Sequence, residues 1–199
     1  VTQSILTMAR GSTRSTEVNE LTKQIIAETV AEEYRRLRIT NDPMSLYERS
    51  DSIKSSKKEM PTIGSWYKTL QRKAEANTNP DYNYQYSYLL KVMKQYIREY
   101  NGQMAYFDGQ STFELLSNIP FINLDISQLE ERFARPLAQQ ILLSWIWEKY
   151  VKKNSEDKKK SRKKRVLVDE AWMLLPYPEA VDFLNTMARR ARKRNVSLA

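Results

Sequence analysis

The sequence predicts an α/β fold that is predominantly helical, on two observations. In the first half of the chain, apolar residues recur at spacings of three and four, the period of an amphipathic helix. In the second half, short apolar runs alternate with helical patterns in the order strand, helix, strand, helix, strand, which predicts a parallel sheet with right-handed crossovers. The 199 residues give room for one domain, or for a domain with a subdomain.

The same patterns divide the chain into three parts. Residues 1–16 read as a helix end and a linker, residues 17–102 as an all-helical subdomain, and residues 103–199 as the part that carries the strands. The subdomain is expected to hold three long helices. The first begins at Thr16 and ends before Asn41, and the others cover 63–76 and 85–100, with Asn101-Gly102 as the final stop.

Four extended segments are expected after residue 102. They are Met104–Asp108, Phe121–Ile126, Arg165–Asp169 and Val196–Ala199. The third carries a continuous apolar run, which is typical of a strand buried on both faces. Of the two intervening helices, one is expected to open with a capping box between Ser127 and Glu130 and to bend at Pro136, and the other spans 180–191.

Composition excludes several kinds of chemistry. The chain has no Cys and no His, which rules out disulfides, Cys/His zinc sites, thiol nucleophiles and imidazole catalysis. Its four glycines are too far apart to form a phosphate-cradling loop. No segment stays apolar over the ~20 residues that a membrane-spanning helix needs, so the expected compartment is the cytosol.

Positive charge is concentrated near the end of the chain. Residues 151–199 hold 14 Lys and Arg against 6 Asp and Glu, so this part carries +8 of the net charge of +9. One cluster is Arg189–Arg194, and the other consists of Lys158, Lys159, Lys160, Arg162, Lys163, Lys164 and Arg165. Such clusters attract phosphate, including that of nucleic acid. The alternative is a solvated loop and a charged helix end.

Two adjacent acids, Asp169 and Glu170, follow the apolar run that ends at Val168. Ligands of open parallel sheets bind at the carboxyl ends of the strands. Adjacent carboxylates there suit phosphoryl transfer, since one can anchor the Mg²⁺ shell while the other polarises the attacking water. The alternative is a strand that ends in a solvated turn.

The motifs VLVDEAWMLL and ARRARKRN-VSLA resemble the ATPases of conjugative type IV secretion systems, the fourth component of VirB-type machines. Upstream, LTKQIIAETVAEEYRRLRITNDPMSLYE is similar to the helical insertion of that family. MAYFDGQSTFELLSNIPFINLDIS and LAQQILLSWIWEKY are similar to segments of its nucleotide-binding core. The resemblance covers most of the chain.

This resemblance implies a partial RecA-like P-loop NTPase core, whose C-terminal part is residues 103–199, with an inserted all-helical subdomain. Asp169 would coordinate Mg²⁺ through water, and Glu170 would be the catalytic carboxylate. Arg192 and Lys193 fall on an arginine/lysine motif that meets nucleotide phosphate in the same or a neighbouring subunit. Cations near the negative end of a helix dipole are the alternative.

The resemblance also implies the cofactors and partners. ATP and Mg²⁺ would serve a motor at the inner face of the cell membrane that drives DNA or protein transfer or pilus assembly. Its partners would be further copies in a ring, other secretion components and DNA.

The chain departs from this family in one respect that matters. The P-loop, Gly-x-x-x-x-Gly-Lys-Ser/Thr, is absent. The chain begins with Val1 and ends inside an apolar run, so we expect a piece of a longer protein that is itself inactive. Two other hypotheses stay open: a basic nucleic-acid-binding module, and an interaction scaffold formed by residues 17–100.

Overall fold

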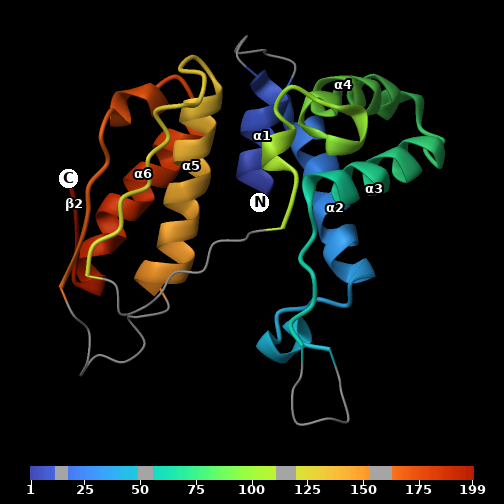
Figure 1. Ribbon diagram of the computed structural model, residues 1–199. Coiled ribbons are helices and arrows are strands. Elements are labelled where there is room, and N and C mark those ends of the chain that lie inside the picture. The colour runs from blue at the N-terminus through green and yellow to red at the C-terminus, as the bar shows by residue number, and fades with distance from the viewer. Residues whose placement is uncertain (12–17, 49–55, 111–119, 153–162) are drawn as a thin grey trace. The chain divides into compact units, whose positions relative to one another are not determined.

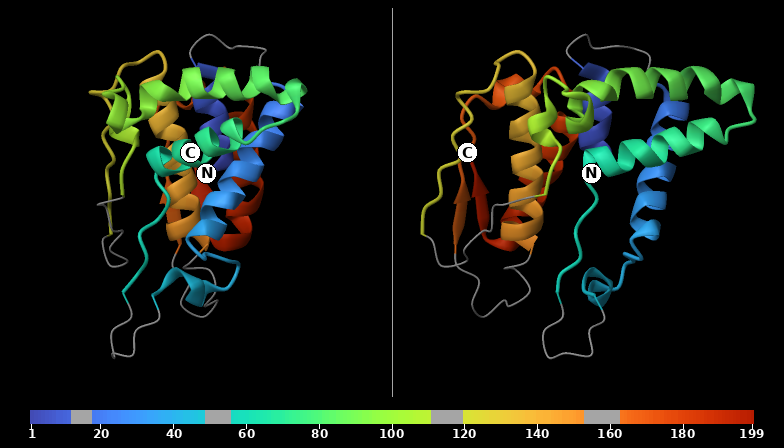
Figure 2. Two further views of the ribbon diagram at one scale, coloured as in Figure 1. Left: turned by 90° about the vertical axis from the view of Figure 1, so that its right-hand side faces the viewer. Right: turned by 45° about the vertical axis from the view of Figure 1, so that its right-hand side comes forward.

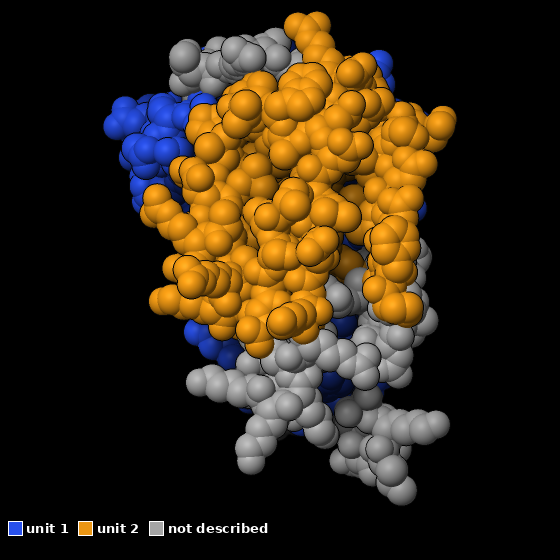
Figure 3. All heavy atoms as spheres, turned by 90° about the vertical axis from the view of Figure 1, so that its left-hand side faces the viewer, with its two compact units in different colours: residues 1–10, 15–112 blue, residues 11–14, 113–199 orange. Residues whose placement is uncertain are grey.

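The computed structural model is predominantly helical, and its described residues contain one parallel sheet of two strands. The described residues are 1–11, 18–48, 56–110, 120–152 and 163–199 (Figure 1). They fall into two compact units: unit 1 is residues 1–10 and 15–112, and unit 2 is residues 11–14 and 113–199 (Figure 3). The sequence patterns predict that the helical subdomain ends at residue 102, whereas unit 1 ends at Thr112.

Unit 1 is a group of helices packed on one apolar core. Its elements are α1 (Thr2–Arg10), α2 (Glu20–Arg36), η2 (Pro43–Leu46), α3 (Ile63–Glu75), η3 (Pro80–Tyr82), α4 (Asn83–Met93), η4 (Lys94–Tyr96), η5 (Arg98–Tyr100) and η6 (Ala105–Phe107). The helices α1, α3 and α4 all pack against α2, and α3 and α4 meet at η3 (Figure 2). The buried side chains Ile26, Leu70 and Leu89 come from three of these helices.

The predicted helix over 63–76 is confirmed as α3, which opens with a capping box between Thr62 and Ser65. The first predicted helix starts later than expected. Its N-cap is Asn19, whose side chain accepts a hydrogen bond from the Thr22 N–H at 2.9 Å. Thr16 lies outside the described residues.

The third predicted helix changes its winding before it ends. It is α-helical only to Met93, and it continues as the 3₁₀ segments η4 and η5. The predicted stop is confirmed, because Asn101 takes the left-handed conformation with φ 52°. The segment Met104–Asp108 was expected to be extended, but it contains the 3₁₀ turn η6.

Unit 2 places helices against a short parallel sheet. Its elements are α5 (Ala134–Ile146), the π-helical segment η7 (Trp147–Lys152), β1 (Lys164–Val166), η9 (Ala171–Leu174), α6 (Pro178–Ala191), η10 (Arg192–Arg194) and β2 (Val196–Leu198). In the register of the sheet, Lys164 is opposite Val196 and Val166 is opposite Leu198. Pairing extends to the bond from the Val168 N–H to the Ala199 carbonyl, 2.8 Å.

Two expectations about the strands are wrong. Phe121–Ile126 forms no strand, and the Phe121 side chain is 75% exposed. The strand β1 is buried on one face only: Val166 is buried, but Leu167 is 67% exposed. Among the described residues, β1 pairs with β2 alone.

The start of α5 also differs from the prediction. Ser127 does not cap the helix, because α5 begins only at Ala134; the Ser127 N–H donates to Asp125 Oδ1 at 2.8 Å. Glu130 alone accepts bonds from the first N–H groups, including those of Phe133 and Ala134. Pro136 lies in the first turn, where an N–H has no helical acceptor, so this position gives no reason for a bend.

Across the described parts of the chain, every helix is too short or too polar to cross a lipid bilayer.

Candidate functional site

The two acids predicted to carry chemistry lie at the carboxyl end of β1. Val168 is the last residue paired with the neighbouring strand, and Asp169 and Glu170 form the turn that leads into η9. Both acids are exposed. Figure 1 shows that this end of the sheet lies at the same end of unit 2 as the beginning of α5.

Glu170 has an unusual backbone conformation. Its φ is 53°, in the left-handed region, and its N–H donates to Asp169 Oδ1 at 3.0 Å. For a residue with a Cβ this conformation costs roughly 1–2 kcal/mol. Strained residues of this kind cluster at functional sites, so the turn is a candidate site on backbone grounds as well as on charge.

Two side chains from the first turns of α5 contact this turn. Arg135 Nη1 lies 3.7 Å from Glu170 Oε2, and Gln139 Nε2 donates to the Asp169 carbonyl at 2.8 Å. Arg135 is held in turn by its Nη2, which donates to the Ser127 carbonyl at 2.9 Å. The segment before α5 therefore fixes the guanidinium that faces Glu170.

The same stretch of α5 holds buried polar atoms without hydrogen-bond partners among the described residues. They are Arg135 Nε, Gln139 Oε1 and both amide atoms of Gln140. Gln140 is only 1% exposed. An unsatisfied buried polar group costs about 1–3 kcal/mol, so this concentration of them next to an acidic turn marks the region as more than a packing surface.

Sequence reasoning did not find Arg135, Gln139 or Gln140. A signal was present: two consecutive glutamines interrupt the otherwise apolar run LAQQILL. Polar residues at core positions of a helix need partners, which predicts a polar neighbour in space.

The acids fit one kind of metal site. No cluster of three Asp, Glu, His or Cys that could hold a metal occurs in the described part of the chain. Mg²⁺ in nucleotide sites needs only one or two carboxylates, because phosphates and waters supply its other ligands. The pair therefore suits Mg²⁺ carried with a nucleotide, and it does not suit a metal held by protein side chains alone.

The predicted basic residues lie at the other end of the sheet. Arg192 and Lys193 belong to η10, which precedes the amino end of β2. They are exposed, and they lie beside the start of β1, whereas Asp169 follows Lys164 by five residues, about 16 Å of extended chain. The acids and this basic pair thus do not form one site within the chain.

The structure does bring the two basic clusters together. A pocket of ≈ 460 Å³ at the amino end of the sheet is lined by Lys163, Lys164, Arg165, Arg192, Asn195, Val196 and Ser197. Lys193 is not among the lining residues. Lys158, Lys159, Lys160 and Arg162 lie outside the described residues.

Comparison with known proteins gave no match to a family model, to a curated protein or to a solved structure.

Proposed function

We propose that this chain is part of an ATPase that powers a type IV secretion or conjugation machine, and that it supplies the acidic wall of the ATP site. In this proposal unit 2 is the C-terminal part of a RecA-like core. The ATPase works in the cytoplasm at the inner face of the membrane, in a ring with further copies of itself. It couples ATP hydrolysis to transfer of DNA or protein, or to pilus assembly.

The observation that carries the proposal is the pair of exposed carboxylates at the carboxyl end of a parallel strand. Ligands of parallel α/β sheets bind at this edge. The buried unpaired polar atoms of Arg135 and Gln139 lie next to the pair and add groups that suit a polar ligand. The sequence resemblance implies that this ligand is ATP with Mg²⁺.

Each residue then has a distinct role. Asp169 would hold the water shell of Mg²⁺ bound with ATP, and that ion would supply positive charge against the phosphates. Glu170 accepts a hydrogen bond from the attacking water and polarises it. Arg135 is a positioning residue, because its ion pair with Glu170 fixes the direction of that carboxylate.

The position of Arg192 and Lys193 limits what they do in this proposal. They lie at the opposite end of the sheet from Asp169 and Glu170. Nothing therefore supports a contact between these two residues and ATP bound at Asp169 and Glu170 of the same chain. In this proposal they contact the nucleotide of a neighbouring subunit.

The test uses the longer protein that contains a P-loop together with this sequence. Glu170→Gln keeps the size of the side chain but removes the charge that polarises water. We expect ATP turnover to fall by about 10²–10⁴-fold with ATP binding retained, as measured by phosphate release and by nucleotide titration.

Asp182→Asn is the matched control, because Asp182 is an exposed acid on α6 that is not part of the turn. It should leave turnover unchanged. Normal turnover in the Glu170→Gln protein would remove the catalytic assignment.

A further inference from the structure

The pocket at the amino end of the sheet joins basic residues from two distant parts of the sequence. Lys164 and Arg165 begin β1, Lys163 directly precedes it, and Arg192 comes from η10. We propose that this pocket binds the phosphate backbone of a nucleic acid. The proposal does not depend on the ATPase assignment, because the acids of that site lie at the other end of the sheet.

A tight turn places Arg192 beside β1. Asn195 takes the left-handed conformation with φ 55°, its N–H donates to the Arg192 carbonyl, and its own carbonyl accepts from the Lys164 N–H at 2.9 Å. The register of the sheet then sets Arg165 opposite Ser197. The backbone pairing of the two strands therefore places these four basic residues at one pocket.

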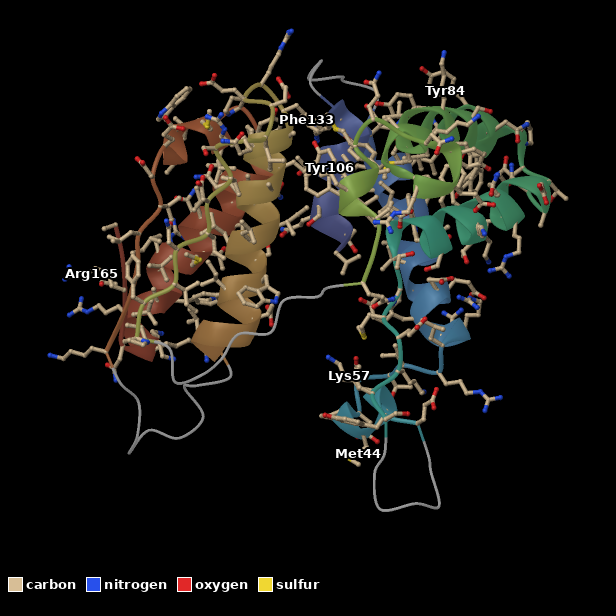
Figure 4. The ribbon with its side chains drawn as sticks, in the orientation of Figure 1. Met44, Lys57, Tyr84, Tyr106, Phe133 and Arg165 are labelled. Atoms are coloured by element: carbon tan, nitrogen blue, oxygen red, sulfur yellow. The ribbon has the colours of Figure 1, made fainter. Side chains whose placement is uncertain are left out.

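The pocket is strongly positive. None of its lining residues is acidic, and no ion pair with an acid is found for Lys163, Arg165 or Arg192 within the described residues. All three are exposed, and Figure 4 shows Arg165 on the side of the strands that faces away from α5. Burial lowers the pKa of Lys164, since its ammonium group is partly desolvated.

The size and chemistry of the pocket favour a phosphodiester chain over a nucleotide. A volume of ≈ 460 Å³ has room for more than one phosphate group. A Mg²⁺-bound nucleotide needs a carboxylate for its metal, and the lining provides none. The run Lys158–Arg162 precedes Lys163 directly in the sequence and extends the positive charge along the chain.

The lining also predicts how the nucleic acid is recognised. Among the described residues that line the pocket none is aromatic, so they offer no surface for stacking on bases. Arginine and lysine bind phosphate oxygens without reading the base. Binding should therefore be independent of sequence and strongly dependent on salt.

The experiment measures binding of a fluorescein-labelled oligothymidylate to the 199-residue chain by fluorescence anisotropy over a series of sodium chloride concentrations. Arg192→Gln and Lys163→Gln should each lower the slope of log K against log salt by about 0.7, the value of one phosphate contact on a single strand. At about 0.1 M salt this is a loss of roughly fivefold in affinity.

Arg190→Gln is the matched control. Arg190 is an exposed arginine on α6 that does not line the pocket, and its replacement changes the net charge by the same amount. We expect less than half the loss seen with Arg192→Gln. Circular dichroism of each variant verifies that the helices are intact.

Three results would overturn the proposal. In the first, the unaltered chain does not bind the oligonucleotide. In the second, Arg190→Gln weakens binding as much as Arg192→Gln, which would indicate that binding depends on diffuse surface charge. In the third, micromolar Mg-ATP displaces the oligonucleotide, which would assign the pocket to a nucleotide. A duplex of the same length distinguishes single from double strands, and binding of either one through Arg192 and Lys163 supports the proposal.

Discussion

At the scale of single residues, Glu33 shows how a charge is accommodated inside unit 1. This side chain of α2 is 1% exposed. It accepts hydrogen bonds from Thr69 Oγ1 at 2.6 Å and from Arg36 Nη2 at 2.8 Å. Burial acts to raise the pKa of Glu33, but the hydrogen bonds from Arg36, Thr69 and Ser65 together lower it below its ordinary value of 4.5.

This lowered pKa predicts a dependence of stability on pH. A carboxyl whose pKa is lower in the folded state contributes stability above its unfolded pKa and loses it as pH falls through the folded pKa. We expect Glu33→Gln to destabilise unit 1 by about 1–3 kcal/mol at neutral pH, because the guanidinium of Arg36 loses its ionic acceptor. The difference between the two proteins should shrink below pH 4.5.

Urea unfolding at a series of pH values measures this difference. Glu28→Gln is the control, because Glu28 is an exposed acid on the same helix. A destabilisation that stays constant from neutral pH to pH 3 would contradict the prediction for Glu33.

At the scale of elements, Gly102 determines how the chain leaves the α4–η5 segment. A Cβ on this glycine would lie 2.1 Å from the backbone oxygen of Gln95. The same oxygen accepts a hydrogen bond from the Met104 N–H at 2.9 Å, so the close approach is part of the turn. Only a residue without a side chain allows it.

Gly102→Ala should therefore destabilise unit 1 by about 1–3 kcal/mol, since backbone must move to admit the methyl group. Gly109→Ala is a matched control, because the nearest atom to its Cβ would be the flexible Arg98 Nη2 at 3.3 Å. Thermal unfolding compares the two variants. Equal unfolding temperatures would show that the Gln95 backbone yields without cost.

At the scale of the whole molecule, the chain has the acid pair of the proposed ATP site but no P-loop. Backbone N–H groups and a lysine of the P-loop hold the phosphates in such sites. We therefore expect the 199-residue chain to release no phosphate from Mg-ATP above the buffer rate, in a colorimetric phosphate assay. Turnover that disappears in Glu170→Gln would contradict this expectation.

The prediction of the fold succeeded where local chemistry decides the structure. The helix α3 and the stop at Asn101 follow from capping residues and from left-handed propensity, which act within a few residues. Prediction failed for Phe121–Ile126, whose apolar composition suits a strand. A strand needs a partner in space, and composition does not provide one.

The residues of the candidate site likewise fall into those that the sequence predicted and those that it did not. Asp169 and Glu170 were found from the apolar run before them, because strand ends are visible in a sequence. Arg135 and Gln139 were missed, since they reach the turn from a different helix. The resemblance left open whether Arg192 meets the nucleotide of its own subunit or of a neighbour, and the sheet places Arg192 at the opposite end from the acids.

The sequence by itself determined the helical character of the first half of the chain, the position of the acid pair and the concentration of positive charge after residue 150. These features depend on neighbouring residues alone. Only the tertiary structure decided that Arg135 faces Glu170 and that Arg192 joins Lys163–Arg165 at one pocket. The physical reason is that strand register and helix packing bring together residues whose separation along the chain carries no such information.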